Sequence, residues 1–126
     1  MRRDLSSDRR RSSRGIWRRR KAHRAGVKIA MGSDAVYSMF GQNTRELGWF
    51  VKAGMTPEEA LKTATVNAAD LLGKGNELGA VAPEYYADLV AVDGDPTADI
   101  AVAIDKVRWV MKTGAAVVMD KTQAVR

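Results

Sequence analysis

The sequence predicts an α/β fold, in which helices flank one buried strand and a group of further strands follows them. Val27–Met31 is a short apolar run with helical patterns on both sides, which is typical of a buried strand of a parallel sheet. Residues 56–73 combine a helix start signal, apolar positions at helical spacing and a terminal glycine. From Leu78 onwards the apolar period changes to two, which indicates strands.

Length and composition exclude several classes of protein. At 126 residues the chain is one ordinary domain at most, and a complete (β/α)8 barrel needs roughly 200 residues or more. The absence of cysteine excludes disulfides and thiolate metal sites, and it suits a reducing cytoplasm. No apolar run approaches the ~18 residues of a membrane span, and no hydrophobic region follows the Arg2-Arg3 pair. We therefore expect a cytoplasmic protein without a membrane partner.

The positive charge is concentrated at the N-terminus. Residues 1–24 hold eleven Lys and Arg against two acids, a charge of +9, whereas residues 25–126 hold ten against thirteen, a charge of −3. The Arg/Ser tract up to about Gly15 has Leu5 as its one large apolar residue, so we expect it to be disordered. It is open to three interpretations: an arm that binds nucleic acid non-specifically, a solvated tail, or mis-started coding sequence.

A candidate functional acid follows the predicted strand. Gly32 allows a sharp turn after the strand, and Asp34 then lies at the carboxyl end, where α/β folds place their chemistry. Residue pattern alone also allows Asp34 to be a simple turn or helix cap. His23 is the single histidine and ends a short helix predicted over Ile16–Ala25. It precedes the strand, so we expect it to be exposed, at the opposite end from Asp34, and not a metal ligand.

The loop after Asp34 carries apolar side chains, including Tyr37 and Phe40, that either line a substrate pocket or cover the end of a barrel. Asn43 or Thr44 is a plausible N-cap of the next helix, which ends at Ala53-Gly54.

One helix is predicted from Thr56, the N-cap of a capping box with Glu59, to Gly73. Its expected buried stripe comprises Ala60, Leu61, Ala64, Ala68, Leu71 and Leu72. Asn67 and Asp70 are expected to be surface or helix-end groups. The predicted strands are Leu78–Val81, Ala87–Val92, Lys106–Lys112 and Ala115–Met119, with a two-residue hairpin at Thr113-Gly114.

Several stretches occur in the order and at the spacing of a known family. They read GVKIAMGSDA, FGQNTREL, AGMTPEEALKTATVNAADLLG, ADLVAVDGDP and VRWVMKTG, within Ala22–Asp120. In this the chain resembles the C-terminal portion of a metal-dependent amidohydrolase of the imidazolonepropionase-like and Xaa-Pro dipeptidase-like kind. The resemblance implies three regions after a basic arm at 1–21: last strand–helix units of a (β/α)8 barrel at 22–74, strands of an accessory β-sandwich at 75–121, and a tail at 122–126.

The resemblance also implies a chemistry. Such enzymes hydrolyse carbon–nitrogen bonds of small amide or dipeptide-like substrates with water activated by a divalent metal, most often zinc. Asp34 matches the aspartate that ligates the metal and transfers the proton, within Gly32-Ser33-Asp34-Ala35, and Tyr37, Phe40 and Asn43 are candidate substrate contacts. The chain has no His-x-His pair, and catalytic zinc typically has three protein ligands.

We therefore expect this chain alone to be inactive and to retain no metal. Two further interpretations remain open. In one, the chain is a non-catalytic protein that binds nucleic acid through residues 1–21. In the other, it is an interaction piece that completes another amidohydrolase chain, with a tendency to self-associate through unpaired strand edges.

Overall fold

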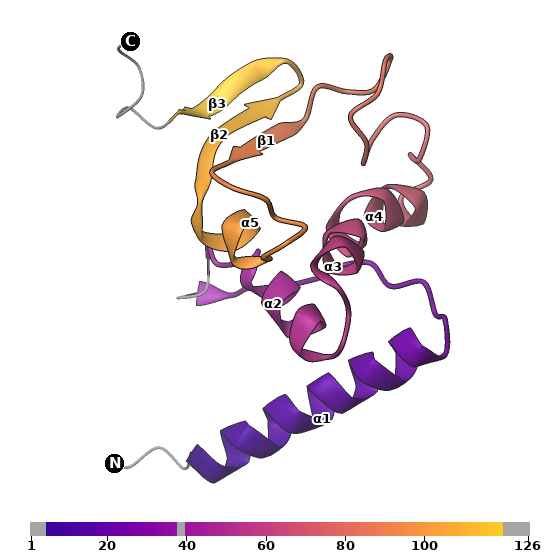
Figure 1. Ribbon diagram of the computed structural model, residues 1–126, viewed down its shortest axis with the longest axis vertical. Helices are drawn as coiled ribbons and strands as arrows, with labels where there is room; N and C mark the ends of the chain where they lie inside the picture. The colour runs from indigo at the N-terminus through magenta and orange to yellow at the C-terminus, as the bar shows by residue number, and fades with distance from the viewer. Residues whose placement is uncertain (1–4, 38–39, 120–126) are drawn as a thin grey trace.

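The computed structural model describes residues 5–37 and 40–119 and has mixed α/β content. A long N-terminal helix lies at one end of the molecule and a three-stranded sheet at the other, with short helices between them (Figure 1). The helices are α1 Leu5–Arg24, α2 Arg45–Lys52, α3 Pro57–Ala64, α4 Val66–Leu71 and α5 Ala101–Asp105. The strands are β1 Leu89–Val92, β2 Val107–Lys112 and β3 Ala115–Met119.

The run Val27–Met31, predicted to be a strand, is not one in this structure. It is a non-helical segment with no strand beside it, because β1, β2 and β3 pair only with one another among the described residues. A strand is defined by its ladder, so an apolar run without a neighbouring strand cannot form one. Ile29 and Met31 still pack against the buried cluster, as the apolar pattern predicts.

The Arg/Ser tract, expected to be disordered, is helical from Leu5 onwards. Helix α1 continues without interruption to Arg24, close to the end of the helix predicted over Ile16–Ala25, and the chain leaves it at Gly26 with φ of +70°. Arginine favours helix and the tract contains no proline, so low hydrophobicity did not prevent helix formation here.

Helix α2 supplies much of the core. Leu47 and Phe50 are each 3% exposed and pack with Met55, Ala60 and Ile100. Its N-cap is Thr44, the second of the two predicted candidates, without a side-chain hydrogen bond.

The capping box at the start of α3 is confirmed. The Glu59 amide donates to Thr56 Oγ1 at 3.2 Å, and the Thr56 amide donates to Glu59 Oε2 at 2.8 Å. The prediction of one helix to Gly73 is wrong, because the helix breaks at Thr65, which has φ of −121° and ψ of −101°. The Thr65 hydroxyl donates to the Leu61 carbonyl at 3.0 Å, and such local bonds compete with helix continuation.

The break changes which side chains of the predicted stripe are buried. Of the stripe, Ala60 is buried, whereas Leu71 and Leu72 are 77% and 70% exposed; Ala69, which was not predicted to belong to it, is buried instead. A single straight helix would have kept Leu71 in line with Ala60 and Ala64.

The C-terminal sheet largely follows the prediction. Strands β1, β2 and β3 are antiparallel in that order, and Lys112 pairs with Ala115 across the hairpin. Thr113 and Gly114 have φ of +51° and +80°, the type I′ geometry expected of a two-residue hairpin. Trp109 and Met111 are half-buried, while Val107 is 38% exposed.

Helix α5 was not predicted from the sequence, and Leu78–Val81 is an irregular segment rather than the predicted strand. Gly79, with φ of +87°, explains part of that difference. A Cβ at this position would lie 2.9 Å from both the Thr65 carbonyl and the Ala69 side chain. The segment therefore packs closely over the break between α3 and α4, which a strand of side-chain-bearing residues could not do.

Candidate functional site

Asp34 lies three residues beyond Met31, in a turn of unusual backbone geometry. Its φ is +47°, in the left-handed region that few residues other than glycine, asparagine and aspartate adopt. The side chain is exposed. Among the described residues it makes no hydrogen bond or ion pair, so the structure gives no support to the alternative of a turn or helix cap.

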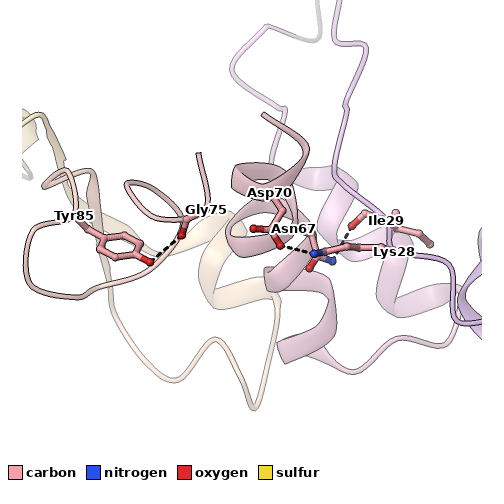
Figure 2. Close-up of polar contacts among 6 residues, drawn as sticks. All are labelled: Lys28, Ile29, Asn67, Asp70, Gly75 and Tyr85. Atoms are coloured by element: carbon pink, nitrogen blue, oxygen red, sulfur yellow. Dashed lines mark hydrogen bonds and ion pairs between the residues drawn. The ribbon is translucent and has the colours of Figure 1, made fainter. Parts of the chain in front are cut away.

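The segment that leads to Asp34 is fixed by helices α3 and α4. The Met31 amide donates to the Thr63 carbonyl at 2.8 Å. Figure 2 shows a second contact, in which Asn67 Nδ2 donates to the Ile29 carbonyl at 2.9 Å. Lys28 forms an ion pair with Asp70 of α4 in the same view. Lys28, Ile29 and Met31 are thereby held by helices α3 and α4, and Asp34 follows three residues after Met31.

Thr63 is the polar residue most deeply buried among those described, at 1% exposure. Its hydroxyl donates to the Ala60 carbonyl at 2.6 Å, so its burial leaves no polar atom unsatisfied. Thr63 and Asn67 are four residues apart and both contact the segment, across the break at Thr65. The prediction that Asn67 and Asp70 are surface or helix-end groups missed this contact. A polar pair at this spacing beside an apolar stripe was the available signal.

Replacing Asn67 with alanine is expected to destabilise the chain by about 1–3 kcal/mol, because the half-buried Ile29 carbonyl loses its donor. Asn67→Gln, which retains the amide, is the matched variant and should lose less. Hydrogen exchange of residues 28–34 should rise in Asn67→Ala while exchange in β2 stays unchanged. Equal protection of residues 28–34 in Asn67→Ala and in the parent chain would show that this bond does not fix the segment.

The predicted substrate contacts lie in and after the following loop. Tyr37 and Phe40 are 87% and 72% exposed, and the Phe40 amide donates to the Tyr37 carbonyl at 3.2 Å, so both belong to one turn. Asn43 is exposed just before α2. No hydrogen bond described by the structure joins any of them to Asp34. Their role in binding a substrate stays a prediction.

His23 lies with α3 instead. Its Nε2 is 3.7 Å from Glu59 Oε2, and its side chain is 28% exposed, less than expected. His23, Val27, Glu59 and Asn67 help to line a cavity of about 310 Å³. The hydrogen bond from the Thr56 amide lowers the pKa of Glu59, and His23 lowers it further.

The donor set does not fit a tightly held metal ion. Within residues 5–37 and 40–119, no three His, Cys, Asp or Glu side chains form a group that could hold one. One exposed carboxylate is too few, since zinc sites in proteins have three or four protein ligands.

A family model described as the amidohydrolase family matches residues 2–117 of this chain. The chain belongs to the amidohydrolase family. The match begins in the Arg/Ser tract, well before Ala22, where the resemblance was expected to begin. Matching proteins include an ochratoxinase of Aspergillus niger, 41% identical over 83 residues, and an imidazolonepropionase of Shouchella clausii, 33% identical over 101 residues.

Solved amidohydrolase structures share the fold. A Xaa-Pro dipeptidase with bound methionine in its active site is 39% identical, with a TM-score of 0.76 over 80% of this chain and 25% of that chain. The match to the ochratoxinase covers 64% of this chain and 17% of that protein. The match to the imidazolonepropionase covers 75% of this chain and 22% of that protein. It therefore spans about a fifth of these curated relatives.

In the described part of the chain, no helix is both long and apolar enough to cross a membrane.

Members of the amidohydrolase family are hydrolases, and they generally bind a divalent metal ion.

Proposed function

We propose that this chain is the part of an amidohydrolase that carries its catalytic aspartate, Asp34, and that it takes part in hydrolysis of a carbon–nitrogen bond when other residues complete the site. The observation that carries the proposal is the geometry at Asp34. A segment held by Thr63 and Asn67 ends in an exposed aspartate with a left-handed backbone.

In this proposal Asp34 acts as a general base and then as a general acid. Its carboxylate takes the proton of the attacking water and delivers it to the leaving nitrogen, which converts an amide nitrogen into an amine that can depart. An exposed carboxylate that has no partner among the described residues is free to approach a substrate. The named relatives act on an ochratoxin, on imidazolonepropionate and on Xaa-Pro dipeptides, as their names state, and a small amide or dipeptide-like substrate is the class we propose here.

Tyr37 and Phe40 are proposed to contact an apolar part of that substrate. Both rings are exposed within one turn after Asp34, where burial against a ligand would remove them from water. Asn43 is proposed to contribute a polar contact from the start of α2.

The test is a graft. The chain replaces the corresponding part of a related, active amidohydrolase, which supplies the histidines that this chain lacks. We expect the graft to hydrolyse the parent enzyme's substrate while the isolated chain hydrolyses none. A well-folded graft without activity, beside an active parent, would contradict the proposal.

A second expectation concerns the isolated chain. Large apolar side chains remain exposed along the segment before and after Asp34 and beyond α4: Val27, Val36, Tyr37, Phe40, Leu71, Leu72 and Val81, at 50–88% exposure. Exposed apolar side chains favour association, so we expect concentration-dependent self-association in sedimentation velocity. A monomer at every concentration, with a sharp cooperative melt, is the contrary result.

A further inference from the structure

Helix α1 presents a basic face that the proposed hydrolase function does not use. Its inner face is identified by its contacts. Arg19 forms an ion pair with Glu46 of α2 and lies 5.6 Å from the centre of the Phe50 ring, and His23 approaches Glu59 of α3. In Figure 1 the helix runs along the end of the molecule, with α2 and α3 on one side of it. The side away from Arg19 is therefore free of these helices.

The positions on that free side form a regular stripe. At about 100° per residue, Trp17 lies about 160° around the helix from Arg19. Positions 10, 14, 17, 21 and 24 recur at intervals of three and four residues, so they share the face of Trp17. They are occupied by Arg10, Arg14, Trp17, Lys21 and Arg24. From Arg10 to Arg24 this basic face extends about 21 Å, at about 1.5 Å per residue.

The cations of the basic face whose side chains are described are available to a ligand. Lys21 and Arg24 are exposed, as is the neighbouring Arg18. None of the three forms an ion pair with a carboxylate in the described part of the chain. Trp17 is 62% exposed, and Lys21 Nζ lies 5.4 Å from the centre of its ring. An exposed cation, Lys21, thus lies beside a large exposed aromatic ring, and further exposed cations occur nearby along the helix.

We propose that the basic face of α1 binds single-stranded nucleic acid, with the cations on the phosphates and Trp17 stacked on a base. Proteins that bind single strands combine these same two elements, a positive surface that follows the backbone and an aromatic ring that stacks on an unpaired base. An anionic membrane fits less well, because a helix that lies in a membrane needs an apolar face. Here Trp17 is the one aromatic or aliphatic residue of the stripe, and the opposite face contacts α2 and α3.

The experiment measures binding of the full chain to a labelled oligothymidine of about 20 nucleotides, longer than common single-strand site sizes. Each phosphate contact to a single strand contributes about −0.7 to the slope of log Kobs against log salt concentration, so four contacts give a slope of roughly −3. Binding should therefore be roughly 50-fold weaker at 200 mM than at 50 mM salt. Lys21→Gln/Arg24→Gln removes two contacts, so the slope should fall to about −1.4. Arg45→Gln/Lys52→Gln on α2 is the matched control, with the same loss of charge and an unchanged slope.

Trp17→Ala separates stacking from charge. It should weaken binding by about 5- to 150-fold, while the salt slope stays that of the parent chain. A duplex of the same length should bind more weakly than the single strand, since its bases are already stacked. Circular dichroism of each variant checks that α1 is retained.

Three results would overturn the proposal. They are an equal slope in Lys21→Gln/Arg24→Gln and its α2 control, unchanged affinity in Trp17→Ala, and binding to anionic vesicles without binding to the oligonucleotide. None of these depends on whether Asp34 is catalytic.

Discussion

Replacing Asp34 with asparagine in the active graft is expected to lower kcat by about 10²–10⁴-fold, the usual contribution of a general base. Asparagine keeps the size of the side chain and one oxygen, but it cannot accept the proton. It also tolerates the φ of +47° at this position, so the backbone should not be strained by the change. We expect the melting temperature to stay the same or rise, because Asp34 makes no described hydrogen bond or ion pair that stabilises the fold.

Asp105→Asn is the matched control, since it makes the same chemical change at an exposed position at the end of α5. It should retain the turnover of the unmodified graft. If Asp34 were a cap, Asp34→Ala would cost about 1 kcal/mol of stability, whereas Asp34→Asn, which caps as well as aspartate, would leave both stability and activity nearly intact. Unchanged turnover in Asp34→Asn would end the case for Asp34 as a catalytic residue.

Gly79→Ala is expected to be the most destabilising of the single-methyl changes considered, at about 2 kcal/mol or more. The φ of +87° is costly for any residue with a Cβ, and the new methyl group would lie 2.9 Å from the Thr65 carbonyl. Backbone atoms there cannot move aside without disturbing the junction of α3 and α4. Chemical denaturation of the graft measures the loss.

Gly73→Ala provides the control for backbone strain alone. Gly73 has φ of +68°, but a Cβ there would meet no atom within 4 Å. Its alanine variant should lose about 1 kcal/mol. Equal losses in the two variants would mean that the close approach of Gly79 to Thr65 contributes nothing to stability.

The elements that the sequence predicted well are those whose signals are local. The capping box of Thr56 and Glu59 and the hairpin at Thr113-Gly114 each depend on a few adjacent residues, and both occur as predicted. The end of α1 at Gly26 is of the same kind. The family is also readable from sequence, because several stretches appear in a fixed order over most of the chain.

The elements that were missed depend on contacts distant in sequence. Val27–Met31 has the composition of a strand but no strand beside it, so the helices α3 and α4 hold it instead. The break at Thr65 is accompanied by the close packing of Gly79, fourteen residues later, which no helical periodicity could reveal. At the candidate site, Asp34 was found from its motif, whereas the contact of Asn67 with the Ile29 carbonyl was not.

The helix in the Arg/Ser tract shows a different limit. Low hydrophobicity predicts that a segment cannot bury enough surface to fold alone. Arg19, however, has both Glu46 and Phe50 as neighbours, and these anchor α1 to α2. Helix propensity and a few contacts at one end therefore outweigh a composition that is otherwise typical of disorder.

The most direct test of the account is the zinc content of the isolated monomer, freed of oligomers by gel filtration, dialysed and measured by elemental analysis. We propose that this chain supplies Asp34 to a site completed by other residues, since no described group of side chains could hold a metal ion. From this we expect far less than one zinc ion per isolated chain, and restored zinc in the active graft. Stoichiometric zinc in the monomer that is lost in Asp34→Asn would contradict it, because the chain would then hold a complete site of its own.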